Sequence, residues 1–213
     1  MSVETILDNL ITRYPVLSSC KQSIWNAYIV MKEAFEQDKK LLVAGNGGSA
    51  ADSEHIVGEL MKGFVKSRTI DTKMKEKLLA IDEKRAESLC SNLQQALPAI
   101  ALTGHTALST AYLNDVDGTL GFAQQVYGYG REHDVFFGIT TSGNSENVLS
   151  AVVVAKARGL KTVVLTGRDG GKVKDMVDVA IIVPEQETYK IQELHLPIYH
   201  ALCLMLEDYF FEN

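Results

Sequence analysis

The chain has 213 residues, of which 46% are hydrophobic and 23% charged, so it has the composition of a globular protein that can bury a sizeable core. Its net charge of -6 disfavours nucleic acid and anionic membranes as partners, because phosphates attract clustered Lys and Arg. No apolar span, no secretory leader and no C-x-x-C pair among three cysteines are found, which predicts a cytoplasmic protein with reduced thiols.

The predicted elements begin with helix over residues 4–38, where apolar residues recur at helical spacing and Pro15 divides the helix in two. Short apolar runs then predict strands that alternate with helices. The expected strands are 40–45, 99–104, 134–143, 161–167 and 177–184. The expected helices are 49–63 with Ser49 as N-cap, 145–159, and about 20 residues from Tyr189.

Five nearly continuous apolar strands separated by helices imply an α/β fold with a parallel sheet that is covered on both faces. Such a sheet binds ligands beyond the carboxyl ends of its strands. The long first and last helices flank this core, and extra helices of that kind often pack subunits together.

Residues 66–97 differ from the rest of the chain because they are highly charged, with apolar residues only at intervals. The pattern predicts one or two amphipathic surface helices inserted before the second strand. A solvated helical excursion and a cover over the active site are both open interpretations. The apolar positions are Met74, Leu78, Leu89, Leu93 and Leu97.

The stretch GNGGSA at 45–50 ends a predicted strand and precedes a predicted helix. Helix N-termini attract anions, and glycines let a phosphate approach the backbone. A dinucleotide, a tight turn without ligand and a phosphosugar compete as explanations. Gly45, Gly47 and Ala50 match G-x-G-x-x-A, but no acidic residue ends a second strand about 20 residues on, which disfavours a dinucleotide. The lack of G-K-[ST] excludes a P-loop.

A second stretch, TTSGNSEN at 140–147, also lies between a strand and a helix. Its four hydroxyls suit a phosphate monoester without much added charge, although a Ser/Thr-rich turn can be only an N-cap. Two such loops on one sheet favour the phosphosugar. The hydroxyls belong to Thr140, Thr141, Ser142 and Ser145.

Two helices carry side chains for acid–base chemistry or metal binding. His55 and Glu59 are four residues apart and share one helix face, either as a usable metal pair or as a solvated pair. On the last helix, Gln192 and His200 lie about 80° apart around the axis. His195 lies about 140° from His200, so we expect it to pack elsewhere or to meet a neighbouring subunit.

The motifs GNGGSAADSEH, TSGNSENV, LTGRDGG and IQELH together resemble the sugar isomerase (SIS) domain family, and within it the phosphoheptose isomerases. The resemblance covers about 1–65 and 98–213, so 1–213 is expected to be one SIS domain with 66–97 inserted. It implies a three-layer αβα sandwich, flavodoxin-like and doubly wound around a five-stranded parallel sheet. It also implies a homotetramer that converts sedoheptulose 7-phosphate into D-glycero-D-manno-heptose 7-phosphate through an enediolate.

The resemblance assigns roles residue by residue. His55, Glu59, Gln192 and His200 match positions that bind a metal, usually zinc, or act in catalysis. Glu59 would be the general base, and His200 an acid or base on the sugar oxygens. The family's substrate-contacting positions correspond to Asn46, Gly47, Ser49, Asn114, Asp115, Thr140, Thr141, Ser142, Ser145 and Gln192.

Three rival functions are a non-catalytic SIS adaptor, a phosphosugar-sensing regulator and an isomerase of another sugar phosphate. Adaptor relatives tend to lack the Glu and the C-terminal His, which this chain has, and a regulator needs a DNA-binding module, for which there is no candidate. The last rival is the closest. Two departures from the family pattern are the 66–97 insert and Pro197, which removes one backbone bond inside the last helix and could kink it.

Overall fold

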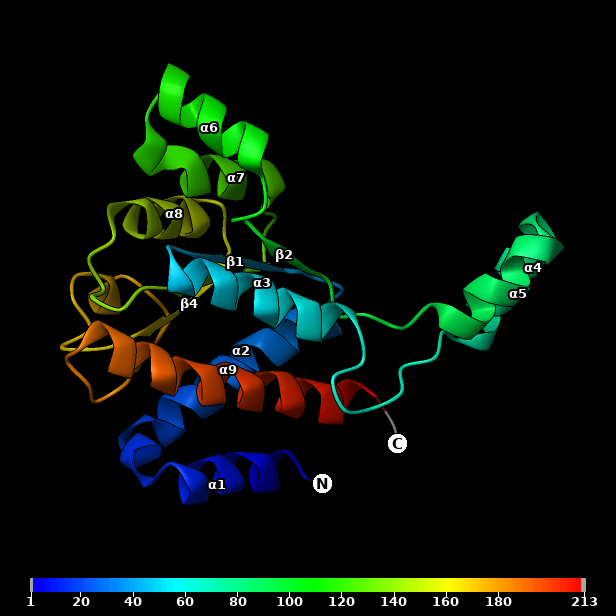
Figure 1. Cartoon of the computed structure of the whole chain (residues 1–213), viewed down its shortest axis with the longest axis horizontal. Helices are drawn as coiled ribbons and strands as arrows, with labels where there is room; N and C mark the ends of the chain where they lie inside the picture. Colours follow the sequence, from blue (N-terminus) through cyan, green and yellow to red (C-terminus); the bar gives the residue numbers. More distant parts are fainter. Residues whose placement is uncertain (1, 212–213) are drawn as a thin grey trace.

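A computed structural model describes residues 2–211 and contains one sheet of five parallel strands in the order β2-β1-β3-β4-β5 (Figure 1). The predicted α/β fold and five-stranded parallel sheet are therefore confirmed. Each strand lies within the range that its apolar run predicted. The strands are β1 (Leu41–Gly45), β2 (Ala99–Ala101), β3 (Val135–Ile139), β4 (Lys161–Thr166) and β5 (Val179–Ile182).

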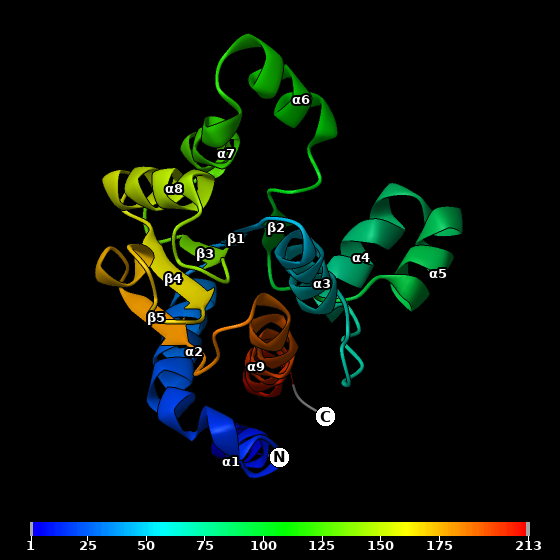
Figure 2. The same cartoon turned by 60° about the vertical axis from the view of Figure 1, so that its left-hand side comes forward.

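Four helices pack over one face of the sheet, with α1 outermost (Figure 2). Their apolar sides pack against strand residues such as Val43 and Phe137, which are fully buried. Pro15 separates α1 from α2 through a short 3₁₀ helix, η1 (Pro15–Cys20), as predicted. The four helices are α1 (Val3–Arg13), α2 (Lys21–Glu36), α3 (Gly48–Met61) and α9 (Thr188–Phe210).

The opposite face of the sheet is covered by α7 (Gly121–Tyr129) and α8 (Glu146–Ala157). Leu42 and Phe136 point to this side, so successive strand residues are buried in opposite cores. This double burial explains why the strands read as continuous apolar runs rather than as alternating ones. α6 (Thr106–Asp115) lies beyond α7, and the short 3₁₀ helices η2 (Gly118–Leu120) and η3 (Val173–Asp175) complete the fold.

The chain reverses its winding direction between β1 and β3. From β1 it passes through α3 on one face to the edge strand β2, and it returns through α6 and α7 on the other face to β3. Parallel sheets bind ligands at such a switch point, beyond the carboxyl ends of the two strands. The glycine-rich loop after β1 and the hydroxyl-rich loop after β3 flank this point.

The structure corrects one expectation, adds two helices and decides between alternatives for two residues of α9. Helices α6 and α7 were not predicted, because their residues show little apolar periodicity. Ser49 is not an N-cap: α3 already begins at Gly48, with Gly47 as N-cap, and Ser49 is buried in the first turn. Of the two alternatives for His195, packing is confirmed, because the residue is fully buried inside the chain. α9 continues through Pro197 as one helix.

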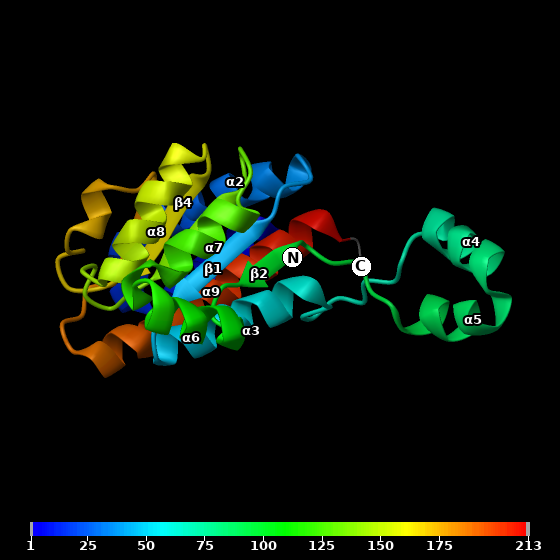
Figure 3. The ribbon, with the colours of Figure 1, turned by 90° about the horizontal axis from the view of Figure 1, so that it is seen from above.

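The inserted residues form a helical hairpin that extends away from the body (Figures 1 and 3). We call this hairpin of α4 (Thr72–Ile81) and α5 (Glu83–Asn92) the arm. It does not lie over the loops at the strand ends, so the interpretation as a cover for the chain's own site is wrong. Among residues 2–211, no helix is both long and apolar enough to cross a membrane.

Candidate active site

The glycine-rich loop turns the chain sharply from β1 into α3. Gly47 has a φ of +57°, a left-handed conformation that L-residues with side chains rarely adopt. Gly48 leaves room for Gln192 of α9, since a Cβ atom at Gly48 would lie 2.7 Å from the Gln192 Nε2 atom. The loop therefore brings the N-terminus of α3 and an amide side chain from the far end of the chain to one place.

The hydroxyl-rich loop after β3 is held by its own side chains. The hydroxyls of Thr140 and Ser145 are 2.9 Å apart, and Ser145 is the N-cap residue of α8. The backbone N–H of Asn144 donates to Ser142 Oγ at 3.2 Å. Thr141 and Ser142 are partly exposed, so hydroxyls and the N-terminal N–H groups of α8 face the space beyond β3.

A pair of asparagine amides joins the two loops. Asn46 Nδ2 donates to Asn147 Oδ1 at 2.9 Å, and Asn147 Nδ2 donates back to Asn46 Oδ1 at 2.8 Å. A pocket of about 250 Å³ lies beside this pair, and Ser109 of α6 and Phe122 of α7 are among its lining residues. The two predicted phosphate-binding loops thus form one site at the switch point.

A second group of side chains lies further along α3. His55 Nε2 is 3.2 Å from Glu59 Oε1, and Lys62 Nζ is 2.9 Å from Glu59 Oε2. The rings of His55 and His200 are 5.0 Å apart between centroids. His200 Nε2 is buried and has no hydrogen-bond partner among residues 2–211. Burial, together with the neighbouring His55, lowers the pKa of His200, so this imidazole is neutral at pH 7.

Two functional candidates that the sequence did not reveal orient His55. The Tyr199 hydroxyl donates to Asp52 Oδ1 at 3.1 Å and lies 3.1 Å from His55 Nδ1. Burial raises the pKa of both Asp52 and Tyr199, and the nearby Asp52 carboxylate raises that of Tyr199 further. Because the Tyr199 hydroxyl donates to Asp52, its oxygen is available to accept from His55 when the imidazole proton is on Nδ1, and His55 Nε2 faces Glu59. The D-x-x-H spacing of Asp52 and His55 was the available signal.

The structure assembles the predicted residues in two groups. Asn46 contacts Asn147 at the end of the hydroxyl-rich loop, with Gly47 and Ser49 in the same turn as Asn46, and His55, Glu59 and His200 meet one another. Gln192 joins the first group, because eight residues of helix, roughly 12 Å, separate it from His200. Asn114 and Asp115 join neither. They are exposed at the C-terminal end of α6, where Asn114 Nδ2 donates to Asp115 Oδ1 at 2.7 Å.

The four predicted metal ligands are only partly brought together. Within residues 2–211, no three His, Cys, Asp or Glu side chains are arranged to hold a metal ion. His55, Glu59 and His200 are nevertheless neighbours: His55 Nε2 lies 3.2 Å from Glu59 Oε1, and the buried His200 Nε2 has no hydrogen-bond partner among residues 2–211. Three of the four predicted ligands are therefore brought together, although not in the arrangement of a metal site, and Gln192 lies apart from them.

Comparison with known proteins gives the chain a family. Residues 78–167 match the SIS domain model. The chain is 40% identical over 205 residues to a phosphoheptose isomerase from Nitratiruptor sp., covering 96% of both chains. It is 38% identical to that of Helicobacter pylori, covering 91% of this chain and 88% of the relative.

Two solved structures show the same fold over nearly the full length. Phosphoheptose isomerase from Neisseria gonorrhoeae superposes with a TM-score of 0.70 at 33% identity, covering 94% of this chain and 97% of that one. The Francisella tularensis enzyme gives a TM-score of 0.73 at 31% identity, with 96% of each chain covered. The chain therefore belongs to the phosphoheptose isomerase family of SIS-domain proteins.

Proposed function

We propose that the protein is an aldose–ketose isomerase that converts sedoheptulose 7-phosphate into D-glycero-D-manno-heptose 7-phosphate. One observation carries the proposal: an anion-binding pair of loops and a cluster of one carboxylate and two imidazoles lie along the same helix, α3. The names of the relatives support the reaction, and the intact cluster argues against a non-catalytic adaptor.

The spacing of the two groups supports a long sugar phosphate. His55 follows Gly48 by seven residues, which is roughly 10 Å along the axis of α3. The side chain of Glu59 leans back toward the N-terminus of the helix and reaches His55. An extended chain advances about 1.2 Å per bond, so the eight bonds from C1 of a heptose to phosphorus also span roughly 10 Å. A phosphate at the loops thus places C1 and C2 near Glu59.

In this pose, the Glu59 carboxylate takes a proton from C1 of the ketose and returns it to C2, which converts the sugar through an enediolate. The neutral imidazole of His200 moves the proton between the two oxygens. Asn46, the hydroxyls of Thr140 to Ser145 and Gln192 hold the substrate, and backbone N–H groups of α3 and α8 receive the phosphate. Asn114 and Asp115 contact the sugar only if α6 shifts toward the loops.

We also propose that His55, Glu59 and His200 hold one zinc ion per subunit. When the proton of His55 is on Nδ1, toward Tyr199, the Nε2 atom of His55 and Glu59 Oε1 are two acceptor atoms 3.2 Å apart, which a cation between them would stabilise. Two imidazoles and a carboxylate are a donor set that suits zinc. Zinc bound there would supply Lewis-acid polarisation of the substrate carbonyl. We further propose a cytoplasmic homotetramer, in line with the family resemblance and the buried free thiols of Cys20 and Cys203.

The activity is tested by NMR detection of solvent-proton exchange at C1 and C2 across a panel of ketose phosphates with five to seven carbons. We expect exchange with the seven-carbon substrate. Glu59→Gln should lower turnover at least about 1000-fold and leave phosphate-ester binding nearly intact, because only the base is lost. Wild-type turnover in this variant would exclude Glu59 as the base, and no exchange with any sugar would exclude the isomerase.

The zinc proposal has its own readout, which is the metal content of the purified protein. His55→Ala combined with His200→Ala should abolish bound zinc, since two of three ligands are removed. His133→Ala, which removes an exposed imidazole in the turn before β3, is the matched control and should retain zinc. A parent protein without zinc after growth in zinc, or a double variant with the parent's zinc content, would contradict the proposal.

A further inference from the structure

The arm has too little packing of its own to account for its two helices. α4 contains no buried residue and α5 contains only Ala86. Each helix has 10 residues, and isolated helices of that length are marginal in water. The arm therefore needs a further surface to be stably folded.

The apolar side chains of the arm remain largely open to solvent. Met74, Leu78 and Ile81 follow at i, i+4 and i+7 and form one stripe of α4. Leu89 and Leu93 form a corresponding stripe at the end of α5. Ile81 is 83% exposed, and Met74, Leu89 and Leu93 are exposed as well. Exposed apolar residues gathered in this way mark an interaction surface rather than ordinary scatter.

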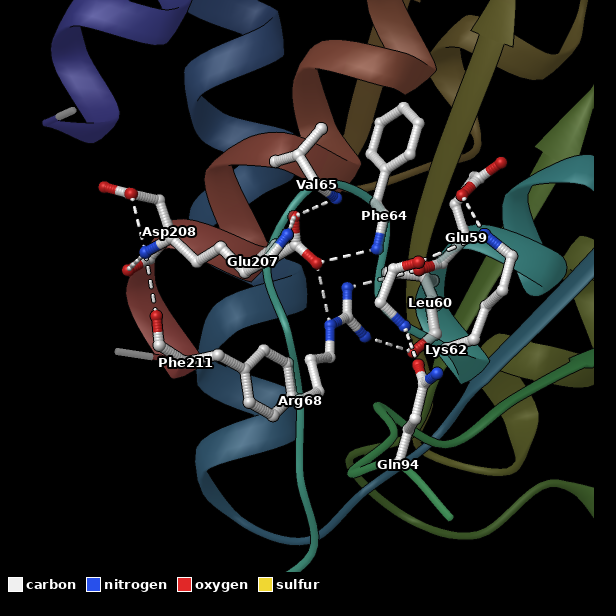
Figure 4. A network of polar contacts seen from close by, with 12 residues as sticks. Glu59, Leu60, Lys62, Phe64, Val65, Arg68, Gln94, Glu207, Asp208 and Phe211 are labelled. Carbon is white, nitrogen blue, oxygen red and sulfur yellow. Dashed lines mark hydrogen bonds and ion pairs between the residues drawn. The ribbon is translucent and has the colours of Figure 1, made fainter. Parts of the chain in front are cut away.

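The base of the arm is tied firmly to the body (Figure 4). Arg68 is 2% exposed, and its guanidinium donates to Glu207 Oε1 at 2.8 Å and to the backbone oxygens of Leu60 and Glu59. Gln95 N–H donates to the Arg68 oxygen at 2.6 Å, which joins the outgoing and returning segments. The arm is therefore presented in a fixed direction, away from its own body (Figure 3).

We propose that the arm of each chain packs its apolar stripes against the body of a second copy of this chain. Charge favours this partner: the arm, residues 72–92, carries five Lys and Arg against four Asp and Glu, whereas the rest of the chain carries sixteen against twenty-three. The body also offers a groove of about 490 Å³ between α1 and α9, with Leu10, Leu196 and Leu204 in its walls. Arg13, Glu193 and His200 line the same groove, so it reaches the candidate active site. The chain's own arm points away from this groove.

The inference rests on the self-association proposed above, so the experiment measures both the self-association and the packing of the arm. Sedimentation gives the mass of the assembly, and hydrogen exchange with mass spectrometry gives the protection of α4 and α5. Ile81→Asp should speed exchange of the arm at least tenfold, because Ile81 contributes almost nothing to the hairpin itself. Val153→Asp, at a 56% exposed position on α8, is the matched control and should leave the arm protected.

Mixed chains labelled with ¹⁴N and ¹⁵N and crosslinked through lysine identify the partner. We expect crosslinks from Lys77 or Lys84 to the body of an oppositely labelled chain. A monomeric wild-type protein would overturn both self-association and this inference. An assembly in which Ile81→Asp leaves the exchange of the arm unchanged, or in which the arm crosslinks only to its own chain, would overturn the role of the arm alone.

Discussion

The side chain of His55 is held from both ends. The Tyr199 hydroxyl lies 3.1 Å from its Nδ1 atom and is itself fixed by Asp52, and Glu59 lies 3.2 Å from its Nε2 atom. Side chains that orient a ligand or a catalytic imidazole in this way set its tautomer as well as its direction. Tyr199 therefore acts as a positioning residue, although it touches no substrate in the proposed pose.

Tyr199→Phe tests this role. Removing the hydroxyl leaves the ring in the core but frees His55 Nδ1, so we expect kcat/KM and zinc affinity to fall about 10- to 100-fold. Long-range ¹H–¹⁵N NMR of the metal-free protein should show a change in the tautomer of His55. Tyr127→Phe, at an exposed position on α7, is the control and should change neither. An unaltered tautomer together with wild-type zinc affinity would remove Tyr199 from the site.

For single residues, the sequence predicted which side chains take part in the chemistry better than it predicted which side chains contact one another. His55 and Glu59 could be paired from their spacing on one helix, because the i,i+4 relation is local. The partnership of Tyr199 with Asp52 joins residues 147 positions apart, so no local pattern could reveal it. Gln192 and His200 share a helix, yet they belong to different groups because helical rise separates residues that helical rotation brings to one side.

The strand–loop–helix units are the elements that build the site. β1 and β3 end side by side, and each leads into a helix whose N-terminus faces the same space. The reciprocal amides of Asn46 and Asn147 fix the distance between the two loops. α9 adds Gln192 to this corner, and the absence of a side chain at Gly48 makes that approach possible.

Gly48→Ala tests how the loop accommodates α9. The new methyl group would lie 2.7 Å from the end of the Gln192 side chain, which is flexible and can move aside. We therefore expect the fold to keep its stability within about 1 kcal/mol, since alanine suits a helix. KM should rise about tenfold, the equivalent of one lost hydrogen bond to the substrate.

The control is Gly58→Ala in the same helix, where an added Cβ atom meets nothing within 4 Å. This variant should keep KM and gain about 0.5 to 1 kcal/mol of unfolding free energy. A Gly48→Ala protein with an unchanged KM would show that Gln192 does not contact the substrate. Steady-state kinetics and denaturant unfolding of both variants give the comparison.

The elements were predictable where burial imposes a pattern. All five strands were found, because burial on both faces gives apolar runs that end in turn residues. α6 has no buried residue and α7 contains three glycine or alanine positions, so neither shows a clear apolar stripe. Neither helix therefore gave a pattern from which it could be predicted.

The whole molecule is joined at the buried pair of Arg68 and Glu207. The pair links the end of α3, the base of the arm and the last turns of α9 (Figure 4). The Glu207 carboxylate also accepts from the backbone N–H groups of Phe64, Val65 and Lys66 at 2.8 to 3.2 Å. The insertion could be recognised from its charge, but this anchoring could not, because its partners are 139 residues apart.

Acid should weaken this junction. Burial by itself raises the pKa of the Glu207 carboxyl, but hydrogen bonds from Phe64, Val65 and Arg68 outweigh it and hold the pKa below the ordinary value. A lowered folded-state pKa stabilises the protein above the unfolded value of about 4.3 and loses that contribution as the pH falls through the folded value. The contribution of Glu207 is thus complete at neutral pH and disappears only below about pH 4.

Glu207→Gln should lower the unfolding free energy at pH 7 by about 3 to 5 kcal/mol, since it leaves Arg68 buried without its counter-charge. The loss should begin to shrink below the unfolded pKa of about 4.3 and should vanish as the pH falls through the lowered folded-state pKa, where the wild-type carboxylate becomes protonated too. Replacing both residues, in Arg68→Met with Glu207→Leu, should not restore stability, because three backbone N–H groups then lose their acceptor.

The control is Asp8→Asn, which breaks an exposed ion pair with Lys21 and should cost less than about 1 kcal/mol. Urea unfolding of the wild type, Glu207→Gln, the double variant and Asp8→Asn at pH 7 and pH 3.5 measures these differences. A double variant as stable as the wild type would show that the backbone contacts of Glu207 contribute little.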